Sequence, residues 1–279
     1  MIIDGKKIAD GIIARLRDEV SVLRTRGMTP GLGIVLVGED PASVLYVSIK
    51  EREARALGMR CDVSRLNTHT TNEELSSVVE ALNADPTIHG IIVQIPIPRT
   101  LDLDSARARI APAKDVDCLN PLSFERLKNG SREVRPPVAE SVKLLIETAG
   151  TTLEGRAVVV VGGGLFASQI AWHCVNNGAN VTQIKEAEHL KSDDLRTAEI
   201  IISVVGKPRL ITTDMVGEGA IVIDVGVSKT DAGIVGDVDF ESVAHKVRAI
   251  TPVPGGVGPV TVACLLDNVV RAAKASLTA

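Results

Sequence analysis

The sequence has few aromatic side chains: one Tyr, one Trp and three Phe make up 2% of its 279 residues. The hydrophobic core must therefore consist of Val, Ile, Leu and Ala, a composition typical of buried parallel strands covered by helices. The chain also lacks an excess of basic residues, since its formal net charge is -4 at pH 7. We therefore expect neither nucleic acid nor a membrane surface as a partner.

Cysteine pairs and long apolar runs are also missing. The four cysteines, Cys61, Cys118, Cys174 and Cys264, lie far apart and form no C-x-x-C pair, which argues against a metal site and against a disulfide framework. No apolar run approaches the roughly 18 residues of a membrane span. Residues 1–27 carry charges in an amphipathic pattern, unlike a signal peptide. These absences favour a cytoplasmic protein without a bound metal.

Strand-like and helix-like segments alternate along the chain. Strands are expected at 31–37, 59–66, 89–95, 157–161, 180–185, 198–205 and 220–225, and helices at 8–23, 43–57, 72–84, 139–149, 165–177 and from 261 onward. Thr71 and Glu74 have the spacing of a capping box. The alternation predicts βαβ units and an α/β fold with mostly parallel sheets. The length suggests about two domains, and Pro136-Pro137 marks a boundary between them.

The only tyrosine, Tyr46, lies four residues before Lys50 in the expected helix 43–57. Residues at this spacing share one face of a helix. An aromatic ring beside an amine suits a flat, polar ligand that is stacked and then protonated or deprotonated. The alternative is a buried tyrosine that happens to neighbour a solvated lysine.

Three further polar residues stand out in the first half. Gln94 ends an apolar strand and needs a hydrogen-bond partner, which is either a ligand or a backbone or water group. Asp115 and Asp117 are separated by one residue, so they face the same side of an extended segment. One of them could anchor donors of a ligand while the other pairs with Lys114. A solvated loop is the alternative.

The second half contains the layout of a dinucleotide site. Residues 162–164 are three glycines between an expected strand and helix, and the following strand ends at Glu186. In such a site, glycines admit a pyrophosphate to the helix N-terminus, and the acid binds ribose hydroxyls. The third glycine of G-x-G-x-x-G should fall at Ala167, so the match is incomplete.

Taken together, these segments resemble the bifunctional methylenetetrahydrofolate dehydrogenase/methenyltetrahydrofolate cyclohydrolase family over nearly the whole chain. The most specific parts are 4–6 (DGK), 37–43 (VGEDPAS), 46–50 (YVSIK), 90–98 (GIIVQIPIP), 114–117 (KDVD), 205–208 (VGKP), 220–226 (AIVIDVG) and 250–261 (ITPVPGGVGPVT). The resemblance implies an N-terminal folate domain at 1–138, completed by helix 260–279, and a Rossmann domain at 139–259. It also implies a folate cleft between the domains, and a homodimer.

The resemblance assigns roles to individual residues. Lys50 is the expected catalytic lysine, with Gln94 as its partner, Tyr46 stacking on the folate and Asp117 holding the pterin edge. Further folate-binding residues are expected at Val93, Pro254, Gly255 and Gly256. The expected nucleotide-binding residues are Gly162, Gly163, Gly164, Ser168, Lys185, Glu186, Val205, Gly206 and Val225. The family implies NADP and a tetrahydrofolate substrate. Glu186 by itself favours NAD because it repels a 2′-phosphate, whereas Lys185 attracts one.

The chain departs from the family pattern at four places. Cys118 replaces a glycine, and the segments 136–139 (PPVA), 167–170 (ASQI) and 184–186 (IKE) differ from the family's usual residues. All four lie on the expected nucleotide side or at its border. One alternative is therefore a cyclohydrolase with weak or lost dehydrogenase activity. Another is a non-catalytic folate-binding homologue, against which the retained Lys50 argues, since binding alone needs no lysine.

Overall fold

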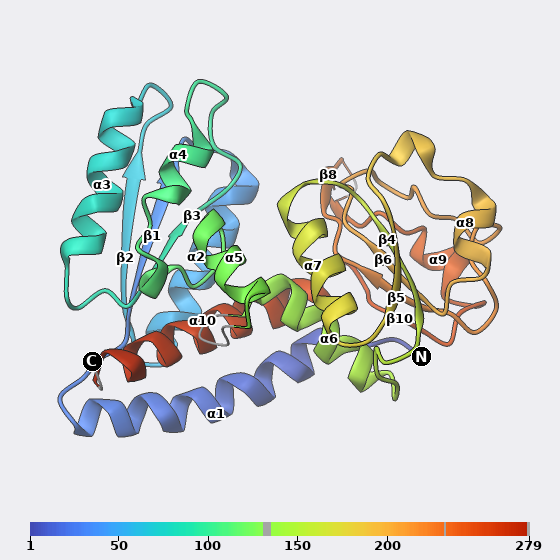
Figure 1. Ribbon diagram of the computed structural model, residues 1–279, viewed down its shortest axis with the longest axis horizontal. Coiled ribbons are helices and arrows are strands. Elements are labelled where there is room, and N and C mark those ends of the chain that lie inside the picture. Colours follow the sequence, from blue (N-terminus) through green and yellow to red (C-terminus); the bar gives the residue numbers. More distant parts are fainter. Residues whose placement is uncertain (131–134, 232, 278–279) are drawn as a thin grey trace. The chain divides into compact units, whose positions relative to one another are not determined.

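The computed structural model describes residues 1–130, 135–231 and 233–277, and the chain forms two compact units (Figure 1). The first unit comprises Gly11–Pro137 and Val262–Ala279, and the second comprises Met1–Asp10 and Val138–Thr261. The last helix therefore returns to the first unit, as expected. The first ten residues group with the second unit, and the domain limits 1–138 and 139–259 stay a prediction. Residues 278 and 279 of the expected terminal helix lie outside the described residues.

The first unit is built on a parallel sheet with strand order β2-β1-β3. Its elements are α1 (Gly5–Thr25), β1 (Gly31–Val37), α2 (Pro41–Ala56), β2 (Arg60–Leu66), α3 (Asn72–Ala84), β3 (Gly90–Val93), α4 (Leu103–Ala108), η1 (Pro112–Lys114), α5 (Pro121–Lys128) and α10 (Val257–Ser276). Helices α1 and α10 are each divided between the two units. The predicted α/β fold is confirmed.

The central strand β1 is buried on both faces. Leu32, Ile34 and Leu36 belong to a core with residues of α1, α2 and α10. Val35 and Val37 belong to a second core with residues of α3 and α4. This separation follows from the two-residue period of a strand. It explains why the strand reads as an unbroken apolar run rather than an alternating one.

Local capping sets where two helices of the first unit begin. A carboxylate oxygen of Asp40 accepts the N–H of Ser43 at 2.8 Å, and Pro41 occupies the first turn of α2. Thr71 and Glu74 form the predicted capping box at the start of α3. Because α2 begins directly after the loop that leaves β1, its first turns stand at the carboxyl edge of the sheet.

The second unit contains a five-stranded parallel sheet with the order β10-β7-β6-β4-β5. Its elements are α6 (Pro137–Thr148), β4 (Ala157–Val161), α7 (Gly164–Asn176), β5 (Asn180–Ile184), η2 (Ala187–His189), α8 (Ser192–Arg196), β6 (Ile200–Ser203), β7 (Ile221–Asp224), β8 (Ser228–Thr230), β9 (Gly233–Val235), α9 (Phe240–Val243) and β10 (Ala249–Ile250). The antiparallel pair β8-β9 was not predicted from the sequence.

Each sheet has one point where the strand order reverses. In the first unit the chain moves from β1 to β2 on one side and to β3 on the other. In the second unit it moves from β4 to β5 on one side and to β6 on the other. Ligands of open α/β sheets bind at the carboxyl ends of strands beside such a reversal. The fold therefore indicates two places to search for a site.

Several expected boundaries differ from the structure by one to three residues, and the largest difference is at the start of the last helix. Helix α10 begins at Val257, four residues before the expected start at Thr261. The proline- and glycine-rich segment before it therefore ends at Gly256, and Pro259 lies in the first turn of the helix. Proline is tolerated there because the first turn's N–H groups have no intrahelical acceptor.

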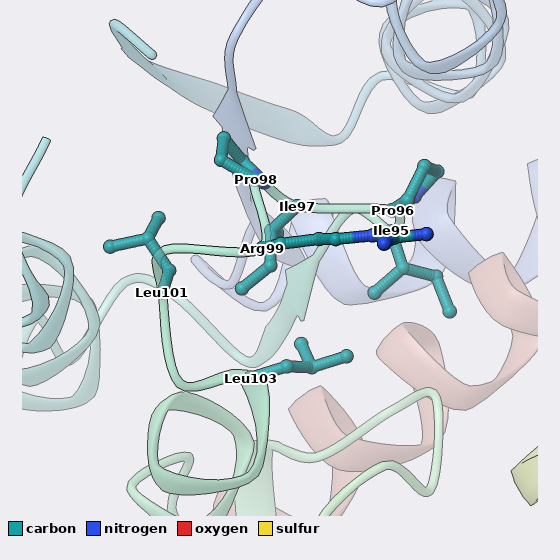
Figure 2. Close-up of a pocket in the computed structure, with 7 residues that line it drawn as sticks. All are labelled: Ile95, Pro96, Ile97, Pro98, Arg99, Leu101 and Leu103. Carbon is teal, nitrogen blue, oxygen red and sulfur yellow. The ribbon is translucent and has the colours of Figure 1, made fainter. Parts of the chain in front are cut away.

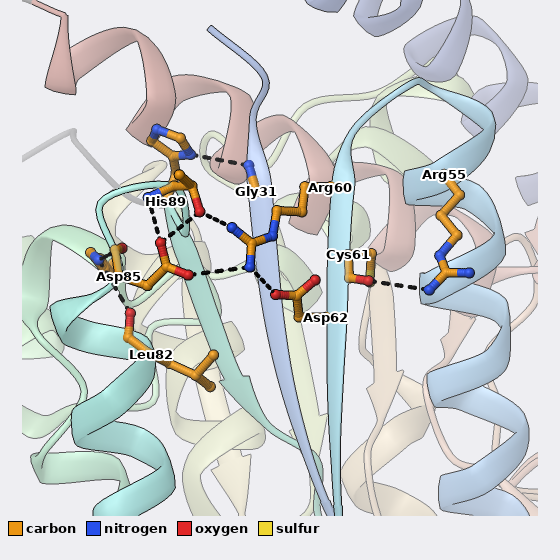
Figure 3. A network of polar contacts seen from close by, with 10 residues as sticks. Gly31, Arg55, Arg60, Cys61, Asp62, Leu82, Asp85 and His89 are labelled. Carbon is orange, nitrogen blue, oxygen red and sulfur yellow. Dashed lines mark hydrogen bonds and ion pairs between the residues drawn. The ribbon is translucent and has the colours of Figure 1, made fainter.

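A polar network at the amino ends of the first unit's strands is structural (Figure 3). His89 Nδ1 accepts the N–H of Gly31 at 3.0 Å, and burial lowers the pKa of this histidine. Arg60 forms ion pairs with Asp62 and Asp85. This network ties the strands together. It lies at the opposite strand ends from Gln94, so it does not face the carboxyl edge of the sheet.

Candidate functional site

Lys50 and Gln94 meet at the reversal point of the first sheet. Lys50 lies on α2, and Gln94 is the residue directly after β3. The Lys50 Nζ atom donates a hydrogen bond to Gln94 Oε1 at 2.9 Å. The structure therefore joins two residues that are 44 positions apart in the sequence.

A second hydrogen bond determines which way the Gln94 amide points. Its Nε2 donates to the Ile95 carbonyl at 2.7 Å, so Oε1 is the atom that faces the lysine. The side chain is 8% exposed, and its backbone N–H donates to the Val35 carbonyl at 2.8 Å. Gln94 is therefore held from three directions and presents one fixed acceptor to Lys50.

Burial and one carboxylate act on the charge of Lys50 in opposite directions. Burial lowers the pKa of its amine, and the negative charge of Asp117 raises it in part. Burial likewise raises the pKa of the Asp117 carboxyl, which the positive charge of Lys50 opposes. The net effect on Lys50 is a lowered pKa. Such an amine gives up its proton more readily than an exposed lysine does.

Tyr46 and Val93 flank this pair along the chain. Tyr46 lies one helical turn before Lys50 on α2 and is partly buried, and burial raises the pKa of its phenol. Val93 is the last residue of β3, is 1% exposed and belongs to the core beneath the site. The tyrosine ring is therefore the nearer of the two to solvent.

The chain continues from Gln94 into an apolar depression of about 440 Å³ (Figure 2). It is lined by Ile95, Pro96, Ile97, Pro98, Arg99, Leu101 and Leu103. Arg99 is the only charged residue in this lining. The depression adds an apolar wall to the carboxyl edge of the first sheet.

The two aspartates of the D-x-D motif have different surroundings. Asp115 is fully buried, and its carboxylate accepts the N–H groups of Leu119 at 3.0 Å and Asn120 at 2.9 Å. Burial raises the pKa of this carboxyl to about 6. Asp115 therefore holds the following turn, whereas Asp117, which is less buried, interacts with the charge of Lys50.

The expectation that Lys114 pairs with one of these aspartates was wrong. Its Nζ donates to the carbonyls of Leu82, Asn83 and Asp85, at 3.3, 2.8 and 2.7 Å. These carbonyls belong to the last turn of α3 and the residue that follows it. A cation at this position satisfies the carbonyls left without intrahelical donors.

Cys118 adopts a backbone conformation that favours glycine. Its φ of 56° lies in the left-handed region, and the side chain is fully buried. At this position, the family that the sequence resembles has a glycine. The chain thus keeps the glycine-like turn after Asp117 while filling the space with a thiol, whose pKa burial raises.

In the second unit, the three glycines lie at the reversal point between β4 and β6. A Cβ atom on Gly162 would lie 2.4 Å from the Val204 carbonyl oxygen, and one on Gly163 would lie 3.0 Å from the Lys185 carbonyl oxygen. Helix α7 starts at Gly164, and no side chain caps it. Gly162 and Gly163 are therefore required by close packing against neighbouring backbone, and the uncapped start of this 13-residue helix leaves its first N–H groups for an anion such as a pyrophosphate.

Three other expected nucleotide-binding residues lie on α7 or directly after β5. Ser168 donates its hydroxyl to the Gly164 carbonyl at 2.8 Å within α7. Lys185 and Glu186 follow β5 and are exposed. Glu186 lies 3.3 Å from His189, which pairs with it only when protonated. The exposed Lys185 ammonium makes no ion pair within the described residues, so it is accessible to an anion.

Residues Val205, Gly206 and Val225 follow the ends of β6 and β7. The N–H groups of Val205 and Gly206 donate to the carboxylate of Asp237, a residue that the sequence analysis did not select. These hydrogen bonds join residues more than thirty positions apart, and the β8-β9 hairpin lies between them in the sequence. Its only local signal was the short GD motif that precedes Val238.

The expected residues Pro254, Gly255 and Gly256 belong to the second unit. The Gly256 N–H donates to the Pro252 carbonyl at 2.9 Å, which closes the turn. A Cβ atom on Gly5 would lie 1.8 Å from the Gly256 carbonyl oxygen. The glycine of the N-terminal DGK motif is thus required for the close approach of this loop.

The described residues contain neither a metal cluster nor a membrane-spanning helix. No group of three or more His, Cys, Asp or Glu residues could hold a metal ion in the described part of the chain. None of its described helices combines the length and apolarity that crossing a membrane requires. All four cysteines are buried, and none of them forms a disulfide.

The fold and these two edges define a class of protein: an α/β protein of two units, one of them Rossmann-type with a glycine turn suited to a dinucleotide. Residues 3–117 match the model for the tetrahydrofolate dehydrogenase/cyclohydrolase catalytic domain, and residues 136–277 match that for the NAD(P)-binding domain of the same family. The chain belongs to the tetrahydrofolate dehydrogenase/cyclohydrolase family.

Individual relatives agree with this assignment. The chain is 44% identical to bifunctional protein FolD 2 of Geobacter sulfurreducens, over 98% of this chain and 96% of the relative. The FolD crystal structure from Campylobacter jejuni is similar with a TM-score of 0.94 and 36% identity, covering 99% of both chains. The enzyme from Trypanosoma brucei, determined with NADP and an inhibitor, has a TM-score of 0.94 and 35% identity, covering 100% of this chain and 99% of that one.

Proposed function

We propose that this chain oxidises 5,10-methylenetetrahydrofolate to 5,10-methenyltetrahydrofolate with NADP and hydrolyses the product to 10-formyltetrahydrofolate. Family membership supports both activities. The single observation that carries the catalytic assignment is the hydrogen bond between Lys50 and Gln94, in a place where burial lowers the pKa of the lysine. A folate-binding protein without catalysis has no need of such an amine.

The oxidation requires alignment more than acid–base chemistry. NADP, when bound, accepts the hydride that leaves the methylene carbon of the substrate. The Tyr46 ring supplies a surface for stacking a flat ring system. The Asp117 carboxylate accepts from donors at the pterin edge, and charge-assisted hydrogen bonds of this kind fix orientation. These groups hold the substrate while the hydride is transferred.

The hydrolysis requires a base. Water attacks the methenyl carbon, and neutral Lys50 takes a proton from this water. The same amine, once protonated, can return the proton to the ring nitrogen as the carbon–nitrogen bond breaks, and the hydroxyl on the former methenyl carbon loses its proton to solvent, giving the 10-formyl product. Gln94 holds the amine in place in both states, because its Oε1 accepts from either form. Asp117 limits how far the pKa of Lys50 falls.

Replacing Lys50 tests the base. We expect Lys50→Met to lower the cyclohydrolase kcat by roughly 100- to 10,000-fold, the range that a general base contributes, while folate still binds. Lys128→Met, which removes an exposed lysine of the same unit, should leave the rate unchanged. Hydrolysis of methenyltetrahydrofolate, followed by absorbance, gives the rate, and calorimetry gives the folate Kd. An unchanged rate in Lys50→Met would refute the assignment.

The pH profile tests the role of Asp117. Because its charge raises the pKa of Lys50, Asp117→Asn lowers that pKa further. The amine then loses its proton at lower pH, so the rising limb of cyclohydrolase kcat against pH should move down by about one pH unit. Asp104→Asn, which alters an exposed carboxylate of the same unit, is the control. A limb that stays in place, or moves to higher pH, contradicts the mechanism.

The choice of NADP is proposed from Lys185. Its exposed ammonium can pair with a 2′-phosphate, and the relative from Trypanosoma brucei binds NADP. We expect Lys185→Gln to raise KM for NADP roughly tenfold, the loss of one charged hydrogen bond, with little change for NAD. Glu186→Gln should act in the opposite direction and lower KM for NADP. Equal effects on both nucleotides in the two variants would assign the 2′-phosphate to other residues.

We also propose a cytoplasmic homodimer that pairs through the second unit. Strand β5 is at an edge of the five-stranded sheet, and Val175 on α7 is 57% exposed. A strand at the end of the sheet and an exposed apolar residue in the same unit suit a second copy of the chain. Light scattering during size-exclusion chromatography should give twice the 29.5 kDa chain mass. A mass that stays at one chain at micromolar concentration rejects the dimer.

A further inference from the structure

The loop after β6 is organised around one buried carboxylate. Asp237 is fully buried, and four donors converge on it. Its Oδ2 accepts the Ser203 hydroxyl at 2.8 Å and the Val205 N–H at 2.7 Å, and its Oδ1 accepts the N–H groups of Gly206 and Lys207, each at 2.9 Å. Three consecutive backbone N–H groups therefore point at a single side chain.

A second carboxylate holds Asp237 itself. Asp224, the last residue of β7, accepts the N–H groups of Asp237 at 3.1 Å, Val238 at 2.9 Å and Gly226 at 3.0 Å. Glycines make this packing possible: a Cβ on Gly226 would lie 2.0 Å from the Asp237 carboxyl carbon. The loops after β6 and β7, both at the carboxyl edge of the sheet, are thus tied together.

The direction of these N–H groups determines what the loop offers outward. In a planar trans peptide the C=O points opposite to the N–H, so the carbonyls of residues 204–206 point away from Asp237. The Val204 oxygen lies against Gly162, and the Gly206 oxygen accepts the Ser228 hydroxyl at 3.0 Å. The Val205 oxygen has no donor among the described residues. The loop therefore presents an acceptor and withholds its N–H donors.

We propose that Asp237 is a positioning residue for the dinucleotide: it turns the N–H groups of 205–207 inward, so that the Val205 carbonyl faces the ligand. An acceptor at this position suits uncharged donors of the dinucleotide, such as ribose hydroxyls or the carboxamide of nicotinamide. It does not suit phosphate, which binds N–H groups. This inference rests on the proposed dinucleotide-dependent function and assigns the pyrophosphate to the glycine turn before α7, where N–H groups are available.

Asp237→Asn is the main test. An asparagine offers one acceptor oxygen where the carboxylate has two, and its NH₂ opposes the loop's N–H groups. We expect the Kd for NADP, measured by calorimetry, and the KM for NADP to rise on the order of tenfold or more. The cyclohydrolase rate and the KM for the folate substrate should stay near those of the parent, since neither requires the nucleotide. Asp193→Asn, an exposed aspartate of the same unit, is the matched control.

The milder variant Ser203→Ala removes one of the four donors to Asp237. It should raise the Kd for NADP by roughly two- to fivefold, and it decides the question if Asp237→Asn does not fold. A lowered Tm with an unchanged Kd for NADP in the two variants would make Asp237 purely structural and overturn the inference. If the parent enzyme itself binds neither NADP nor NAD, the proposed dehydrogenase function and this inference fall together.

Discussion

The site depends on holding an amine in place without fixing its charge. A carboxylate in direct contact with Lys50 would keep the amine protonated, and an apolar surrounding would leave it without an orientation. Gln94 solves both problems, because its neutral oxygen accepts from the amine at 2.9 Å in either protonation state. Burial then lowers the pKa of Lys50, and the charge of Asp117 limits the shift. The strands and helix caps of the first unit serve to bring these three residues together.

In the second unit, two turns differ in whether their backbone N–H groups are free or already bound. At the start of α7 they have no side-chain cap and remain available to an anion. In the loop after β6 they are taken up by Asp237, so this loop faces outward with an acceptor. Two neighbouring turns at the same sheet edge thereby differ in what they bind, although both are built from glycine-containing sequences.

Much of the fold could be predicted from local patterns. The strands at 31–37 and 157–161 and the helix at 72–84 have the predicted limits, because apolar runs and the Thr71 capping box are signals within a few residues. Helix α10 begins four residues before its predicted start. Its prolines and glycines suggested a loop, although proline is compatible with a first helical turn. The α/β class followed from the alternation of these elements.

The site was less predictable because its contacts join distant parts of the chain. The sequence indicated that Gln94 ends a strand and that Lys50 lies on a helix, but only the structure gives the hydrogen bond between them. Charge alone suggested that Lys114 would pair with a neighbouring aspartate, whereas the carbonyls at the end of α3 take its donors. The only local signal at Asp237 was the short GD motif, because its hydrogen-bond partners lie some thirty residues earlier.

The most direct test of the account uses the unaltered protein and two assays. Nucleotide reduction by 5,10-methylenetetrahydrofolate is followed with NADP, with NAD and with neither, and hydrolysis of methenyltetrahydrofolate is followed in parallel without nucleotide. We expect reduction of NADP and hydrolysis at a measurable rate. Hydrolysis without reduction of either nucleotide would contradict the role given to the second unit, and absence of hydrolysis would contradict the role of Lys50.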